Sequence, residues 1–134
     1  DVTRASVAAR ANLGMSRTFQ ITNLFPNLTV AENMRLALRG RSRTKFSLFG
    51  ADALSADEAE RADRALGLSR LGGRQGVLVK ELSYGEQRQL EMAMALVAEP
   101  KLLLLDEPAA GLSPAERTMV SEIIRALPRD LTMI

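Results

Sequence analysis

Apolar residues recur at helical spacing in the first third of the chain. Val30, Met34 and Leu38 follow one another at intervals of four residues, which places them on one face of a helix. Thr29 precedes this helix and Glu32 lies three residues later, a pattern in which the two side chains cap the helix start reciprocally. The spacing therefore predicts an amphipathic helix that starts after Thr29.

Two further segments start with a serine cap. Ser55, with a glutamate three residues later, opens a predicted helix over roughly 56–67. Ser113 precedes Pro114, a residue that the first helical turn tolerates because the missing N–H has no partner there. We expect this second helix to run to about Leu127, since a proline follows it.

An unbroken apolar run lies in the last third of the chain. Lys101–Asp106 contains four consecutive leucines, short enough for a strand that is covered on both faces in a parallel sheet. A helix is predicted before it over Gln87–Ala98, and Leu131–Ile134 starts like another strand. Strand, helix and strand over 101–134 form a βαβ unit, and Met15–Gln20 predicts one more short strand. The pattern predicts an α/β fold with parallel strands.

The composition excludes several classes of function. Apolar residues make up 46% of the 134 residues and charged residues 25%, as in ordinary soluble domains. The net charge of +2 gives no argument for a nucleic-acid partner, which needs several basic residues on one face. The chain has no cysteine and no histidine, so thiolate metal sites and histidine general bases are excluded. No apolar run approaches the ~20 residues that span a bilayer.

One basic segment, Arg39–Lys45, leaves two interpretations open. It is either a solvated connection or a contact with anionic lipid or a protein partner.

Two acidic residues follow the leucine run. Ligands of open α/β sheets bind beyond the carboxyl ends of the strands, where Asp106 is expected. Magnesium prefers one or two carboxylates together with phosphate oxygens, so Asp106 is a candidate ligand. Glu107 is a candidate for orienting or deprotonating a water that attacks a γ-phosphate. The alternative is a buried strand that ends in solvated acids.

The hexapeptide Leu82–Gln87 places a serine and a glycine at a helix start. Backbone N–H groups, the Ser83 hydroxyl and the helix dipole together favour a phosphate at this point. Gly85 allows a ligand to approach the backbone closely. The alternative is that Ser83 caps its own helix and binds nothing.

Four motifs in one order resemble those of the ATP-binding cassette (ABC) ATPases. Leu82–Gln87 resembles the signature motif, and Leu102–Glu107 follows at family-like spacing and resembles Walker B. The segment 110–113 resembles the D-loop, and 17–20 resembles the strand that ends in the Q-loop glutamine. The stretches 17–33 and 107–112 are similar to the branched-chain amino acid importer subfamily. The resemblance implies a partial P-loop NTPase core with parallel strands plus a helical subdomain.

The resemblance also implies roles for particular residues. Gln20 would contact Mg²⁺ and the attacking water, Asp106 would bind Mg²⁺, and Glu107 would be the catalytic base. The residues that would contact the γ-phosphate of an ATP held by a second ATPase subunit are Ser83, Gly85 and Gln87. Ser113 departs from the commonest D-loop, which has an aspartate there.

The same resemblance divides the chain and gives it partners. Residues 1–23 would be the end of the core with the Q-loop, 24–98 the helical subdomain, and 99–134 the Walker B and D-loop part. The protein would act with transmembrane permease subunits and a second ATPase subunit, as a homo- or heterodimer. It would bind no nucleic acid and would lie peripherally on the cytoplasmic face of the cell membrane.

Two family elements are absent from the sequence. No segment matches the phosphate-binding loop, Gly-x-x-x-x-Gly-Lys-Ser/Thr, and there is no switch histidine. Both would lie outside these residues, and the two ends look like those of a fragment. We therefore expect the chain alone to be inactive as an ATPase, and its open sheet edges to cause self-association or folding of the helical part only.

Two other functions remain in competition. A chromosome-maintenance or DNA-repair ATPase carries a similar signature but inserts long coiled coils before it, and the 63 positions between Gln20 and Ser83 show no sustained heptads. A non-catalytic helical module that docks on transmembrane subunits is the alternative from a different class.

Overall fold

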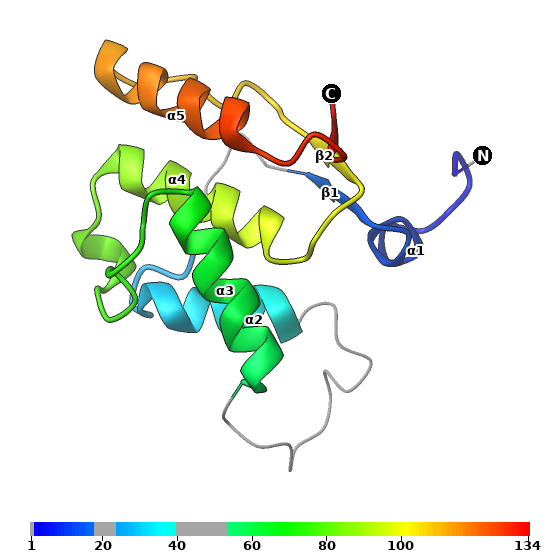
Figure 1. Ribbon diagram of the computed structural model, residues 1–134, viewed down its shortest axis with the longest axis horizontal. Coiled ribbons are helices and arrows are strands. Elements are labelled where there is room, and N and C mark those ends of the chain that lie inside the picture. The colour runs from blue at the N-terminus through cyan, green and yellow to red at the C-terminus, as the bar shows by residue number, and fades with distance from the viewer. Residues whose placement is uncertain (1, 18–23, 40–53) are drawn as a thin grey trace.

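The three-dimensional structure is a computed structural model that describes residues 2–17, 24–39 and 54–134. A small parallel sheet lies at one side of the molecule and a group of helices at the other (Figure 1). In the described ranges, no helix is long and apolar enough to cross a bilayer.

The sheet has the strand order β1-β2-β3, with all pairs parallel. Its strands are β1 (Met15–Arg17), β2 (Leu102–Leu104) and β3 (Thr132–Met133). The register aligns Arg17 with Leu104, so the carboxyl ends of β1 and β2 lie side by side. The parallel α/β fold is confirmed, and the sheet brings residues about 90 positions apart to one edge.

The central strand β2 is buried on one side only. Leu103 is fully buried, whereas Leu102 and Leu104 on the opposite face are half-buried. The expectation that both faces are covered is met in part, since Leu103 belongs to the cluster of buried side chains and the opposite face is half-buried.

The predicted βαβ unit is present as β2, α5 (Pro114–Ala126) and β3. Ser113 caps α5 through its hydroxyl, which accepts a hydrogen bond from the Glu116 N–H, and Pro114 occupies the first turn. α5 ends before Leu127, one residue earlier than predicted, and Pro128 follows. The proline prevents another helical turn because it has no N–H to donate.

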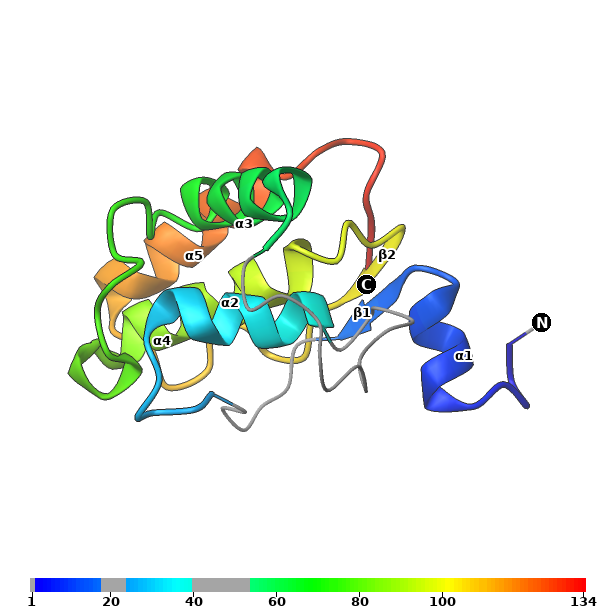
Figure 2. The same cartoon turned by 90° about the horizontal axis from the view of Figure 1, so that it is seen from below.

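Three α-helices and one short 3-10 helix form the helical part. They are α2 (Val30–Arg39), α3 (Ala56–Leu68), the 3-10 helix η1 (Val79–Glu81) and α4 (Tyr84–Leu96). The capping pairs predicted at the starts of α2 and α3 are both present: the Thr29 N–H donates to Glu32, and the Ser55 N–H donates to Glu58. The helices pack closely, and Figure 2 shows α3 over α2 and α4.

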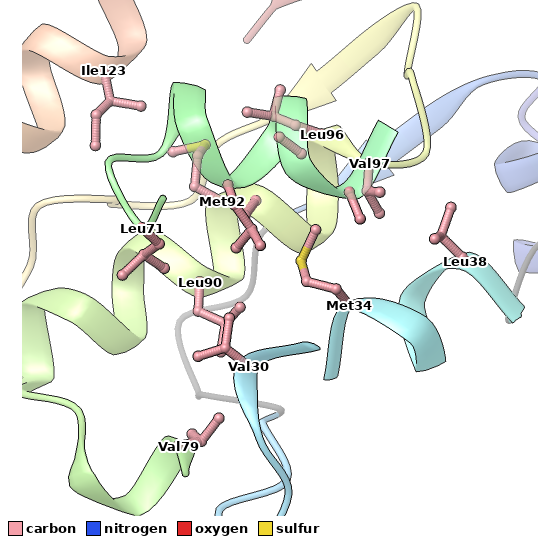
Figure 3. Close-up of a cluster of buried hydrophobic side chains, with 14 of the residues drawn as sticks. Val30, Met34, Leu38, Leu71, Val79, Leu90, Met92, Leu96, Val97 and Ile123 are labelled. Atoms are coloured by element: carbon pink, nitrogen blue, oxygen red, sulfur yellow. The ribbon is translucent and has the colours of Figure 1, made fainter. Parts of the chain in front are cut away.

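One hydrophobic cluster joins the helices to the sheet (Figure 3). Val30 and Met34 of α2, Leu90 of α4 and Leu103 of β2 are all completely buried. Ile123 of α5 belongs to the same cluster. These contacts fix the orientation of β2 relative to α4, the two elements that carry the candidate motifs.

The first helix, α1 (Val7–Asn12), has no buried residue. Both views place it beside β1, at the opposite end of the molecule from the start of α5 (Figures 1 and 2). Gly14 separates the two elements with a φ of 89°, a backbone conformation that favours glycine.

Candidate functional site

Asp106 lies two residues beyond β2, at the carboxyl edge of the sheet. Its Oδ2 accepts a hydrogen bond from Nη2 of Arg17 at 2.7 Å, and the two side chains are about half exposed, at 44% and 54%. The pairing of β1 with β2 brings them together, since Arg17 ends β1. Arg17 belongs to the Q-loop motif, but this pairing was not predicted, because strand register cannot be read from the motif alone.

Glu107 follows in a left-handed conformation, with a φ of 45°. Few non-glycine residues adopt this region, and such strain often accompanies a functional turn. The carbonyl of Glu107 accepts a hydrogen bond from the Ala110 N–H at 2.9 Å, which closes the turn, and its side chain is exposed. The chain therefore reverses direction here with the carboxylate in solvent.

The ligand atoms that Asp106 offers fit a magnesium site in one respect. A single carboxylate at a sheet edge is what Mg²⁺ uses when phosphate oxygens supply further ligands. Among the described residues there is no group of three or more acidic residues that would hold a metal ion alone. Gln20, the other predicted ligand, lies outside the described residues.

The signature segment forms the first turn of α4. Ser83 is its cap: the Ser83 hydroxyl accepts from the Glu86 N–H at 3.2 Å, and the Ser83 N–H donates to the Glu86 carboxylate at 2.9 Å. The prediction that this helix starts at Gln87 is wrong because the reciprocal cap recruits residues 84–86 into the helix. The helix also ends at Leu96, two residues earlier than predicted.

Capping does not remove Ser83 as a phosphate contact. A hydroxyl that accepts one hydrogen bond still carries an O–H to donate. The side chain of Gln87 instead turns back on its own segment, where Nε2 donates to the carbonyl of Leu82 at 3.2 Å. In this structure Gln87 therefore stabilises the motif.

The D-loop lies against the signature segment. Gly111 has a φ of 73°, and a Cβ added there would lie 3.5 Å from the ring of Tyr84. The Arg88 guanidinium stacks on the same ring at 5.2 Å from its centroid, donates to the Tyr84 hydroxyl at 2.8 Å, and pairs with Glu91 at 2.8 Å. These bonds outweigh the burial of the guanidinium and raise the pKa of Arg88 above its ordinary value, so it remains charged.

A small cavity of about 20 Å³ lies between the sheet edge and α4. Asp106 and Pro108 line it on the sheet side, and Arg88, Glu91 and Met92 line it from α4. The volume is enough for about one water molecule. The structure thus places Asp106, the D-loop and the signature helix in one region.

These features define a class. A parallel sheet with an aspartate at the carboxyl end of its central strand, beside a Ser-Tyr-Gly helix start, is the arrangement of an α/β nucleotide-binding protein. A family model described as "ABC transporter" matches residues 2–110. The chain belongs to the ABC transporter family of ATP-binding proteins.

Several individual proteins are similar to it. The "high-affinity branched-chain amino acid transport ATP-binding protein LivG" is 38% identical in Salmonella typhimurium and in Escherichia coli K12, over 87% of this chain. The sulfate/thiosulfate import ATP-binding protein CysA 2 of Chromobacterium violaceum is 37% identical over 98% of the chain. The chain spans about half the length of LivG, 48%, and 32% of CysA 2.

A solved structure agrees with the fold. The ADP conformation of an ATP-binding cassette of an ABC transporter superposes with a TM-score of 0.80 and 25% identity. The match covers 99% of this chain and 54% of that protein. The P-loop NTPase fold class is confirmed.

Proposed function

We propose that the intact protein is the ATP-hydrolysing subunit of an ABC importer of branched-chain amino acids. The carrying observation is the placement of Asp106 and Glu107 at the sheet edge, beside a capped signature helix, in a chain of this family. The similarity to LivG, whose name states branched-chain amino acid transport, supports the substrate. The match to CysA 2 makes other imported substrates the competing outcome.

Asp106 would hold Mg²⁺, which neutralises the charge of the β- and γ-phosphates. Arg17 restrains the carboxylate through Oδ2 and fixes its direction before the metal binds. Glu107 would accept a proton from the attacking water, and the strained turn holds its carboxylate in solvent, where a nucleotide reaches it. Gln20 would orient the same water.

The signature residues would act on a second copy or a related ATPase subunit. Ser83, at the positive end of the α4 dipole, would donate to the γ-phosphate of ATP held by that subunit, and Gly85 would let the phosphate approach the backbone closely. Gln87 would serve the same contact by stabilising the Leu82 carbonyl from within the motif. A nucleotide site shared between two subunits would account for the position of the signature segment at the start of α4 and not at the edge of the sheet.

The helical part is the proposed contact with transmembrane permease subunits. Asn33 is completely buried in α2 and its amide bonds both backbone groups of Phe25, at 2.9 and 3.2 Å. Phe25 is nevertheless 52% exposed. Leu36, which lies about one turn after Asn33 in α2, is 38% exposed. Exposed apolar side chains, one of them on a backbone held by hydrogen bonds, suit a protein partner, and they also support a docking role without catalysis. The division at residues 24–98 and a position on the cytoplasmic face of the membrane belong to the same proposal.

These 134 residues alone are proposed to be inactive as an ATPase, because the sequence contains no phosphate-binding loop. The test compares the chain with an extended protein that supplies the loop before residue 1 and the histidine segment after residue 134. Magnesium-dependent binding of a fluorescent ATP analogue is expected only for the extended protein. In that protein Glu107→Gln is expected to abolish phosphate release and to trap an ATP-bound dimer.

Tight binding of the analogue by the 134 residues alone would contradict this proposal. If the extended protein neither binds nor hydrolyses ATP while still binding permease subunits, the docking function is supported instead. Phe25→Ser is then the decisive variant, because it removes the exposed ring but leaves the backbone groups that Asn33 bonds.

A further inference from the structure

Glu116, in the first turn of α5, contacts two helix starts at once. Its Oε2 accepts hydrogen bonds from the Ser113 N–H at 2.9 Å and from the Ser113 hydroxyl at 2.7 Å, which caps α5. The other oxygen, Oε1, lies against Gly85 at the start of α4, where it is the atom nearest to a Cβ added to that glycine. One carboxylate therefore bridges α5, which follows the D-loop and is called the D-loop helix below, and α4, the signature helix.

Gly85 leaves room for the Glu116 carboxylate in the position that the structure shows. Its φ is not in the left-handed region, so backbone conformation does not demand glycine. A Cβ added to Gly85 would overlap Oε1 of Glu116 and lie 2.9 Å from its Cδ and 3.0 Å from its Cγ. Ordinary Cβ atoms do not come that close, so any side chain at 85 has to displace the carboxylate.

We propose that Glu116 is a positioning residue that locks the D-loop helix onto the first turn of the signature helix, so that the two motifs move as one unit. The inference rests on the proposed function in one respect, namely that Ser83 and Gly85 face the γ-phosphate of the opposite subunit. The local lock itself depends only on the Gly85–Glu116 contact.

Charge supports the same role. Glu116 lies at the amino end of α4 as well as of α5, where a negative charge is favoured by both helix dipoles. The bonds from Ser113, together with the nearby backbone N–H of Gly85, lower the pKa of Glu116, so the carboxylate is ionised at neutral pH. The Glu116 carboxylate thus accepts hydrogen bonds from donors that would otherwise bond water.

The first experiment is a double-mutant cycle on the extended protein, measured by thermal unfolding. Gly85→Ala is expected to lower the midpoint by about 2–4 °C, because the new Cβ displaces the carboxylate at the end of a flexible side chain. In Glu116→Ala the obstructing atoms are absent, so adding Gly85→Ala should lower the midpoint much less. Gly67→Ala is the matched control, since Gly67 lies in α3 with no atom within 4 Å of the added Cβ.

The second experiment measures the ATP concentration that half-assembles the Glu107→Gln dimer. Glu116→Ala is expected to raise it about 10-fold, the effect of one lost positioning contact. Binding of the ATP analogue to the monomer should be unchanged. Glu116→Gln, which keeps the length and an acceptor oxygen, should restore most of the affinity.

The outcomes separate the two proposals. The proposed lock is wrong if the effects of Gly85→Ala and Glu116→Ala on the unfolding midpoint are additive. It is also wrong if Glu116→Ala leaves unchanged the ATP concentration that half-assembles the dimer. If Gly85→Ala does not fold but the double variant does, the lock is supported. If neither folds, the lock is tested by the ATP concentration that half-assembles the dimer of the Glu116→Ala variant. If the parent Glu107→Gln protein fails to dimerise with ATP, the proposed function fails, while the cycle still tests the lock.

Discussion

The helical part and the sheet of this protein are held together in different ways. α2, α3 and α4 each start with a reciprocal cap and meet in one cluster of fully buried side chains. The strands have two or three residues, and β3 is exposed throughout. The comparison teaches that the more deeply buried part of the chain carries the signature motif, whereas the proposed catalytic carboxylates lie on the less buried part.

The largest expected difference concerns matched leucines in the two regions. Leu90→Ala in α4 should lower the free energy of unfolding by about 2–5 kcal/mol, since Leu90 is completely buried. Leu104→Ala in β2 should lower it by only about 1–2 kcal/mol, because the half-buried side chain loses less apolar area. Denaturant unfolding of the extended protein measures both, and equal losses would remove the distinction between the regions.

A smaller effect is expected from the caps of the helical part. Ser55→Ala should lower the free energy of unfolding by about 1 kcal/mol, because the Glu58 N–H loses its acceptor. Ser121→Ala is the control, since Ser121 lies exposed within α5 and caps nothing. A loss of similar size in the control would show that the capping bond contributes little.

The capping glutamates also predict a pH dependence. The bonds from Thr29 to Glu32 and from Ser55 to Glu58 lower the pKa values of both carboxyls below 4.5. Their stabilisation is fully present above pH 4.5, where both states are ionised, and is lost as the pH falls through the folded-state pKa values. Unfolding curves at pH 3 to 6 should show this decline, and Glu32→Gln with Glu58→Gln should flatten it.

The smallest effect is expected at the sheet edge. Arg17→Ala should change the free energy of unfolding by less than about 1 kcal/mol, because the pair with Asp106 is about half exposed and solvent screens it. The loss should shrink further at high salt. A salt-independent loss above this size would mean that the sheet edge is as strongly fixed as the helical part.

Local signals predicted the helices well. The serine and threonine caps gave the starts of α2, α3 and α5 because a cap bonds a residue only three positions away. The helix range beginning at Gln87 starts three residues late, whereas the alternative that Ser83 caps its own helix is confirmed by its reciprocal bonds with Glu86.

Long-range contacts at the candidate site were not predictable from the sequence. The order of the motifs indicated the family, but no local pattern pairs Arg17 with Asp106 or Glu116 with Gly85. The first pair depends on the register of β1 and β2, and the second on the packing of α5 beside α4. Both are set by the whole fold.

Tyr84 makes the signature segment visible to spectroscopy. It is the single tyrosine among these 134 residues, which contain no tryptophan. Its ring lies close to both the Arg88 guanidinium and the D-loop glycine, so a movement of the D-loop changes the surroundings of the ring. Ultraviolet absorption and intrinsic fluorescence of these residues near 280 nm therefore report on the signature motif without an added label.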